Sequence, residues 1–151
     1  IDTSHGAYKF KGEPKIAFEI IEKTRKLLPN TYLVSHGSSS VPEEHLALIN
    51  QYGGKMEAAK GVPLEALQKA IQFGINKINV DTDIRLAATG AVRKFLAENP
   101  SDFDPRSYLK ASRAAIAEEI KKRMEVFGTA GQAAAVPQWG LAEMKELYKK
   151  N

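Results

Sequence analysis

Short strand-like segments that alternate with helices constrain the fold of this chain more than any other feature. Apolar runs rich in strand-forming residues lie at the very start, at 31–34 and at 75–80. Amphipathic helices are expected at 14–28, 42–52, 63–73 and 83–99. Strands that are joined by helices in series pair in parallel, through right-handed crossovers. The pattern therefore predicts an α/β fold.

The chain is too short for a closed barrel of such units. A (β/α)₈ TIM barrel needs about 250 residues, and this chain has 151. We expect residues 1–151 to form a single domain, the C-terminal portion of such a barrel with about three β/α units and extra C-terminal helices. Because the chain opens at Ile1 without methionine, inside an expected strand, we expect it to be a piece of a longer polypeptide.

Two helices are expected to extend the domain beyond the last β/α unit. The first follows a turn-rich segment at 100–105, and the second covers 141–148. The first is amphipathic, and its apolar residues are expected on the buried side: Leu109, Ile116, Ile120, Met124 and Phe127.

Composition excludes several classes of function. The sequence holds no cysteine, which excludes a disulfide scaffold, a thiol nucleophile and a cysteine-ligated metal. No apolar run is long enough to cross a membrane, and 43% hydrophobic with 26% charged residues is ordinary for a soluble domain. The net charge is +4, but basic and acidic residues are interspersed, so nucleic acid is not an expected partner. These features are typical of a cytoplasmic protein.

Two Ser-His-Gly sequences follow expected strands, at 4–6 and 35–37. In the second, Gly37 would let the backbone approach a ligand closely. The N–H groups of 38–40 come just before a helix that begins near Pro42, with serine as its N-cap. A helix N-terminus attracts anions, so we expect an anion site here.

The two histidines of these sequences, His5 and His36, are candidate metal ligands. Their matched settings favour a shared role, and imidazole without cysteine favours zinc. A catalytic zinc ion has three protein ligands and an open position. The remaining histidine, His45, lies within a helix and is interpreted as a surface residue. The third ligand would then be a carboxylate or a residue outside this sequence.

A second polar cluster follows the strand at 75–80. Strand alternation places Lys77, Asn79 and Asp81 on one face. Polar side chains inside a barrel are costly unless they bind something, so this face is expected to line a site.

The next two residues, Thr82 and Asp83, suit helix caps, and for Asp83 we expect no other role. In barrels the loops after the last two strands commonly bind phosphate. Here these loops would be 36–40 and 81–83.

Four motifs occur in order along the chain. They are Ser-His-Gly-Ala-Tyr-Lys-Phe (4–10), His-Gly-Ser-Ser-Ser-Val-Pro (36–42), Lys-Ile-Asn-Val-Asp-Thr-Asp (77–83) and Asp-Pro-Arg (104–106). Together they resemble class II fructose-1,6-bisphosphate aldolase, a family of zinc-dependent (β/α)₈ enzymes. The resemblance implies a lyase of glycolysis and gluconeogenesis. It would cleave fructose 1,6-bisphosphate to dihydroxyacetone phosphate and glyceraldehyde 3-phosphate.

The resemblance also implies site residues, cofactors and an oligomer. His5 and His36 would be two of three Zn²⁺ ligands, and a monovalent cation, Na⁺ or K⁺, would lie near the phosphate site. Arg106 would reach into the neighbouring subunit of a homodimer or homotetramer and bind the far phosphate; its other interpretation is a residue of a helix's first turn. Asn79 would be the catalytic residue at the hydroxyl end of dihydroxyacetone phosphate. Residues around that ligand's phosphate would be Gly6, Lys9, Gly37, Ser39, Asp81 and Thr82.

The match lacks part of the family's site. The third zinc histidine, the acidic residue beside it and the mobile-loop glutamate that moves the proton all precede the matched part. The 151 residues alone are therefore expected to be inactive. Three alternatives stay open: a Schiff-base aldolase that uses Lys77 or Lys9, a tagatose-1,6-bisphosphate aldolase, and a non-catalytic phosphosugar-binding or assembly module.

Overall fold

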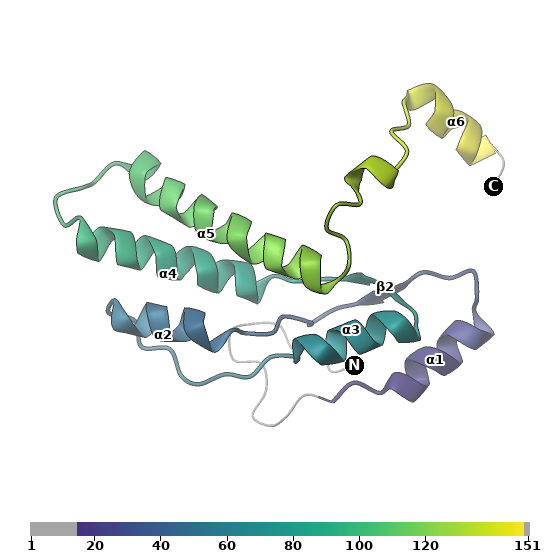
Figure 1. Cartoon of the computed structure of the whole chain (residues 1–151), viewed down its shortest axis with the longest axis horizontal. Helices are drawn as coiled ribbons and strands as arrows, with labels where there is room; N and C mark the ends of the chain where they lie inside the picture. Colours follow the sequence, from purple (N-terminus) through teal and green to yellow (C-terminus); the bar gives the residue numbers. More distant parts are fainter. Residues whose placement is uncertain (1–14, 150–151) are drawn as a thin grey trace.

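A computed structural model describes residues 15–149 of the chain. Figure 1 shows a layer of helices along a short sheet and a last helix that stands apart from the rest. The elements in chain order are α1 (Phe18–Leu27), β1 (Leu33–Ser35), α2 (Glu43–Gln51), α3 (Leu64–Phe73), β2 (Ile75–Ile78), α4 (Thr82–Glu98), α5 (Pro105–Val126), the short 3₁₀ helix η1 (Ala133–Ala135) and α6 (Leu141–Lys149). The strand expected at the start of the chain lies outside the described residues.

The two strands pair in parallel, as the sequence predicts for strands joined by helices. Ser35 is opposite Ile78, and the backbone N–H of Asn79 extends the pairing by donating to the carbonyl oxygen of Ser35 at 3.0 Å. The carboxyl ends of β1 and β2 therefore meet at one edge of the sheet. The segments that follow them, 36–41 and 79–83, start side by side. The α/β class is confirmed for the described residues.

Two apolar clusters hold the helices in place. One joins α1, α3 and β2 through Ile21, Ala70 and Ile75. The other lies between α2 and α4, where Leu46 and Ile49 pack with Leu86. Burial of such side chains gives about 1.5–3 kcal/mol each. The second cluster also includes Val41 and Ala59, so it reaches the segments that follow the strands.

Helix ends mostly follow the expected signals. Gly74 ends α3 with φ of 121°, a value that favours glycine. Asp104 caps α5, since its side chain accepts the N–H of Arg106. The serine N-cap expected for α2 was wrong: Pro42 occupies that position and no side chain caps the helix. The serine hydroxyls are bonded elsewhere.

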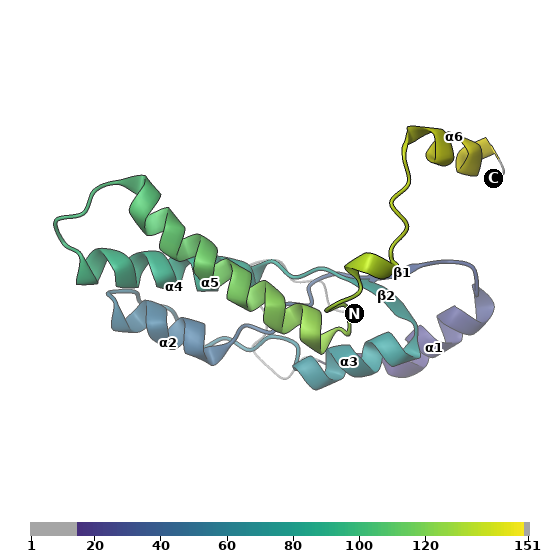
Figure 2. The same ribbon diagram turned by 45° about the horizontal axis from the view of Figure 1, so that its top comes forward.

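The buried face expected for α5 was wrong as well. Leu109, Ile120 and Met124 are exposed, whereas the buried residues of α5 are Ser112, Glu119 and Arg123. The helix packs on α4 (Figure 2), and Arg123 on its inner face pairs with Asp83 of α4. Apolar periodicity predicted the helix but not the face that it buries in this chain.

The strand β1 is less buried than its apolar sequence predicts. Tyr32 and Val34 are exposed, and only Ser35 of this strand is buried. In α1 the expected apolar face is likewise only partly covered, with Ile21 buried and Ile20 and Leu27 exposed. The helix α6 stands away from the other elements in both views (Figures 1 and 2). Within residues 15–149 no helix combines the length and apolarity of a membrane span.

Candidate functional site

The site begins with a contact between the two strand ends. Asn79 follows β2, and its side-chain nitrogen Nδ2 donates to Nδ1 of His36, which follows β1, at 2.8 Å. Lys77 contacts the side-chain oxygen of the same asparagine through Nζ. Three residues that the sequence assigned to chemistry therefore meet at the edge of the sheet. His36 and Lys77 are both exposed at this edge.

The segment after β1, residues 36–41, is called the serine loop here. Gly37 has φ of 64°, which lies in the left-handed region where glycine is favoured. Two hydroxyls then tie the loop to its own strand: those of Ser35 and Ser38 lie 2.6 Å apart, and the Ser38 hydroxyl donates to the carbonyl of His36 at 3.2 Å. The loop is therefore held in a tight turn directly beside the histidine.

Ser39 joins the serine loop to the segment after β2. Its buried hydroxyl oxygen accepts the backbone N–H of Asp81 at 3.2 Å and that of Thr82 at 3.0 Å. These N–H groups begin α4, so Ser39 stabilises the helix N-terminus from outside. Its hydroxyl therefore contacts protein atoms.

Asp81 and Thr82 differ in exposure. Thr82 is buried, while the Asp81 side chain is exposed and pairs with Arg85 at 2.9 Å. The site thus offers an exposed carboxylate and a buried hydroxyl next to the serine loop.

Asp83 is not the simple helix cap that the sequence predicts. Its carboxylate is fully buried, and Asp81, not Asp83, occupies the N-cap position of α4. The carboxylate accepts two consecutive backbone N–H groups of the serine loop, those of Ser40 at 2.9 Å and Val41 at 2.8 Å. The amide of Ser40, which was expected to bind an anionic ligand, is therefore already bonded to an anion of the protein.

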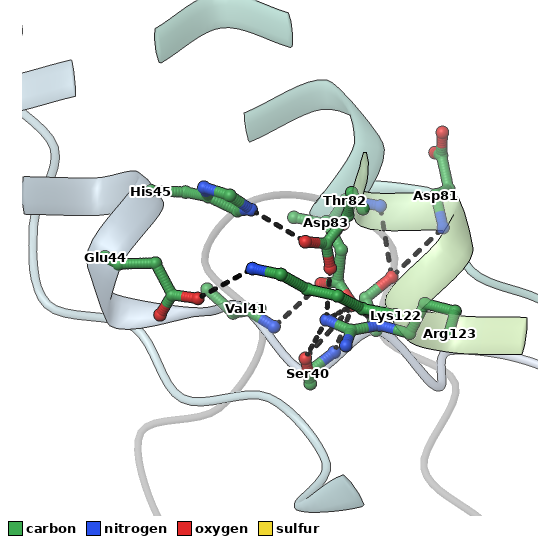
Figure 3. A network of polar contacts seen from close by, with 11 residues as sticks. Ser40, Val41, Glu44, His45, Asp81, Thr82, Asp83, Lys122 and Arg123 are labelled. Carbon is green, nitrogen blue, oxygen red and sulfur yellow. Dashed lines mark hydrogen bonds and ion pairs between the residues drawn. The ribbon is translucent and has the colours of Figure 1, made fainter. Parts of the chain in front are cut away.

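A buried charge cluster surrounds Asp83, shown from close by in Figure 3. Arg123 of α5 donates to the Asp83 carboxylate from Nε at 3.2 Å, and its Nη2 lies 2.5 Å from Oε1 of Glu119. The other oxygen of Glu119 lies 3.1 Å from Nε2 of His45. The interpretation of His45 as a surface residue was wrong, since its side chain is 14% exposed and contacts a buried acid. These four residues are called the Asp83 cluster.

The serine loop is also supported from a second side. The backbone at Gly61 runs so close that an added Cβ would lie 2.3 Å from the carbonyl oxygen of Ser39. The next residue, Val62, donates its N–H to that same carbonyl oxygen at 3.0 Å. Sequence reasoning missed this support because a glycine in a loop gives no signal of its tertiary neighbours.

Arg106 does not join the strand-end residues. It lies in the first turn of α5, at the end of the α4–α5 pair that is remote from β1 and β2 in Figure 1. Its guanidinium pairs with Asp104 at 2.5 Å, and its side chain is 91% exposed. The Arg106 side chain, with the Arg106 backbone N–H, holds the pKa of Asp104 below its usual value. His5, Gly6 and Lys9 lie outside the described residues.

The donor set at the strand ends fits a metal ion in part. His36 accepts at Nδ1 from the side-chain nitrogen of Asn79, whose side-chain oxygen contacts Lys77. Residues 15–149 contain no group of three histidines, cysteines or acids with metal-binding geometry. They place one imidazole at the strand ends, so a metal ion there would need further ligands from elsewhere.

Comparison with known proteins identifies the family. A family model described as "Fructose-bisphosphate aldolase class-II" matches residues 1–132. Relatives named fructose-bisphosphate aldolase share 46% identity in Pseudomonas aeruginosa and 50% in Nostoc commune, each over 99% of this chain. The chain belongs to the class II fructose-bisphosphate aldolase family. The resemblance seen in its motifs is confirmed.

The alignment with these aldolases covers only part of each relative. The chain spans 43% of the length of the two aldolases just named, and 44% of a plasmid-encoded fructose-bisphosphate aldolase of Cupriavidus necator, to which it is 46% identical. The aldolase motifs at 36–42, 77–83 and 104–106 all lie within the described residues.

Proposed function

We propose that this chain forms part of a zinc-dependent aldolase that cleaves fructose 1,6-bisphosphate into dihydroxyacetone phosphate and glyceraldehyde 3-phosphate. The observation that carries the proposal is the pairing of His36 with Asn79 at the strand ends, in a chain of the class II aldolase family. A ligand histidine usually donates its second ring N–H to a hydrogen-bond acceptor. Asn79 would be that acceptor, with its side-chain oxygen turned toward His36 when zinc is bound.

Family membership also supports a proposal for the fold. The residues would be the C-terminal portion of a (β/α)₈ barrel, with α5 and α6 as its helical extension. The parallel pairing of β1 with β2 and the site at their carboxyl ends agree with this architecture. The exposed Tyr32 and Val34 beside β1 agree with it too, because barrel strands are covered on both faces.

In the proposed reaction, cleavage removes a proton from the C4 hydroxyl and breaks the C3–C4 bond. The electron pair of that bond moves toward the carbonyl carbon of the dihydroxyacetone phosphate half, and C3 then takes up a proton to give dihydroxyacetone phosphate. Zinc, held by His36 and His5 with a third ligand, would act as a Lewis acid on that carbonyl. The residue that moves the proton is expected in the part of the relatives that this chain does not cover.

The residues of this chain would bind and orient the substrate. The backbone at Gly37 and the serine loop, together with Asp81 and Thr82, would hold the phosphate of the dihydroxyacetone half, with Gly6 and Lys9 beside them. Asn79 would bind the hydroxyl end while it orients His36. Fixing both ends of the substrate lowers the entropic cost of reaching the transition state.

Three further parts of the proposal concern the assembled protein. Arg106 would bind the far phosphate in a neighbouring subunit of a homodimer or homotetramer, and its exposure at the far end of α5 supports this. A Na⁺ or K⁺ ion would accompany the phosphate. A cytoplasmic location and a role in glycolysis and gluconeogenesis stay predictions.

The test is turnover by the complete polypeptide that carries this sequence. It should cleave fructose 1,6-bisphosphate, lose activity in a chelator and resist inactivation by borohydride in the presence of substrate. Faster turnover of tagatose 1,6-bisphosphate would assign the other sugar. Borohydride trapping would instead favour a Schiff base at Lys77 or Lys9. Binding of sugar bisphosphate without any cleavage would favour the alternative function, a non-catalytic phosphosugar-binding module.

A further inference from the structure

Asp83 contacts the serine loop through two consecutive backbone N–H groups, those of Ser40 and Val41. We propose that Asp83, with Arg123 as its counter-ion, is a positioning residue that fixes the serine loop in its phosphate-binding form. The inference rests on the proposed function in one respect, since it assigns phosphate binding to this loop. It gives the Asp83 cluster a role that the aldolase motifs alone do not indicate.

The first reason is backbone strain in the loop. Val41 has φ of 53°, and no other non-glycine residue of the described chain has positive φ. A buried β-branched residue in this region costs about 1–3 kcal/mol and persists only when its surroundings hold it there. The hydrogen bond from the Val41 N–H to the Asp83 carboxylate and the packing of Val41 against Leu46 and Ile49 supply that hold.

The second reason is the position of the carboxylate. Asp83 is fully buried at the start of α4, and its side chain reaches the serine loop from the segment that follows β2. Oδ1 accepts from Val41, and Oδ2 accepts from the N–H of Ser40 and from its hydroxyl at 3.1 Å. One side chain therefore fixes two adjacent peptide units relative to the α4 N-terminus. Hydrogen bonds to an ionised acceptor are roughly twice as strong as neutral ones.

The third reason is the way the buried charge is balanced. A buried carboxylate is tolerated only when it is paired and hydrogen-bonded. Arg123 does both: it donates to Asp83 from two nitrogens and to the Ser40 hydroxyl at 2.8 Å. Arg123 is in turn paired with Glu119, which contacts His45 of α2. The cluster thus ties α2, α4 and α5 to a single loop.

This arrangement has a consequence for ligand binding. The loop is held in shape before any phosphate arrives, so binding does not have to order it. When the contact between Asp83 and the serine loop is lost, the loop backbone no longer holds one geometry. Affinity for phosphate should fall, and KM should rise more than kcat falls, because Asp83 touches the loop and not the bond that breaks.

The experiment compares Asp83→Asn and Arg123→Lys with two matched controls in the complete polypeptide. Asparagine keeps the shape of the side chain but turns an N–H₂ group toward the loop donors, and lysine keeps the charge of Arg123 without its planar fork. The controls are Lys122→Gln and Glu118→Gln, which change the charge of exposed neighbours on the same helix. Glu119→Gln, compared with Glu118→Gln, tests the contribution of Glu119 to the Asp83 cluster.

Two readouts are taken: the dissociation constant of inorganic phosphate by calorimetry and amide hydrogen exchange of 38–41 relative to α3. Loss of preorganisation lowers affinity, so we expect phosphate affinity to fall about 10-fold and exchange at 38–41 to rise selectively. The controls should match the parent protein. If Asp83→Asn fails to fold, Arg123→Lys gives the same comparison with a milder change.

The proposal is overturned if folded variants exchange faster or melt earlier yet bind phosphate and substrate as the parent does, because the cluster would then be structural only. It is also overturned if exchange at 38–41 stays unchanged. Failure of the proposed function gives a different result. The parent protein would then cleave no sugar bisphosphate, while its phosphate binding and the amide exchange of 38–41 would still test the role of Asp83.

Discussion

The side-chain amide of Asn79 lies 2.8 Å from Nδ1 of His36, although 43 positions separate the two residues in the chain. The contact exists because β1 and β2 are parallel neighbours whose carboxyl ends coincide, with Ser35 opposite Ile78. Each residue follows its strand directly. A single pairing of strands thus brings the candidate metal ligand and the candidate catalytic amide together.

Asn79→Ala removes this contact. Removal of the group that orients a metal-bound histidine typically costs about 10-fold to 100-fold in activity or metal affinity. We expect a loss of that size in kcat, with little loss of stability because Asn79 is only half-buried. Steady-state kinetics with fructose 1,6-bisphosphate measure it. Asn76→Ala is a partial control, since Asn76 also links the strands but bonds the backbone N–H of Leu33. Equal kinetics for Asn79→Ala and the parent would contradict an orienting role.

Arg106→Ala tests recognition of the far phosphate. Arginine binds phosphate with two parallel hydrogen bonds, which lysine does not reproduce. KM for fructose 1,6-bisphosphate should rise strongly, whereas proton exchange of dihydroxyacetone phosphate, which lacks the far phosphate, should change little. The α5 cap should survive, because Asp104 still accepts the backbone N–H at position 106. Equal effects on both reactions would argue against this assignment.

The lowered pKa of Asp104 predicts that the stability supplied at the α5 N-terminus depends on pH. The side chain and backbone N–H of Arg106 lower the pKa of Asp104 in the folded protein. A group whose folded pKa is depressed stabilises fully above its unfolded pKa, and this stabilisation is lost as pH falls through the folded value. The acid side of the stability profile should therefore be flatter in Asp104→Asn than in the parent. Thermal unfolding between neutral and acidic pH measures this, and parallel profiles would exclude it.

Gly61→Ala tests the second support of the serine loop. The added methyl group would lie 2.3 Å from backbone atoms of residues 39 and 40, so the loop or its neighbour must move. Overpacking of this kind costs about 1–3 kcal/mol. We expect that loss in denaturant unfolding, together with weaker phosphate binding. Gly128→Ala is the comparison, since nothing lies within 4 Å of an added Cβ there and only its positive φ opposes the change. If the parent and Gly61→Ala bound phosphate with similar affinity, the backbone contact at Gly61 would not contribute to phosphate binding by the serine loop.

The sequence predicted the local structure well because its signals are local. Strand formers at 75–78, Gly74 after α3 and Asp104 before α5 depend on neighbours within a few positions. The polar residues after the strands also predicted which segments would meet, since parallel pairing brings strand ends together.

The parts that were wrong depend on tertiary partners. Asp83 and His45 have the local signature of a helix start and a helix surface. Only α5, folded back over α4, shows that Asp83 is buried against Arg123 and that His45 contacts the buried Glu119. The prediction of the buried face of α5 was wrong for the same reason. A Glu and an Arg four positions apart are typical of an exposed ion pair on a helix. No local pattern therefore indicates that Glu119 and Arg123 belong to a buried cluster.

We propose that His36 holds a catalytic zinc ion, and zinc content measured together with turnover tests this. Zinc content and turnover of fructose 1,6-bisphosphate are determined on the same preparations of the complete polypeptide, for the parent and for His36→Ala. Since His36 is exposed, its loss should change stability by no more than about 0.5 kcal/mol, so both proteins should be folded. We expect about one zinc per chain and turnover in the parent, and loss of both in the variant. Zinc content and turnover that survive the substitution would contradict it.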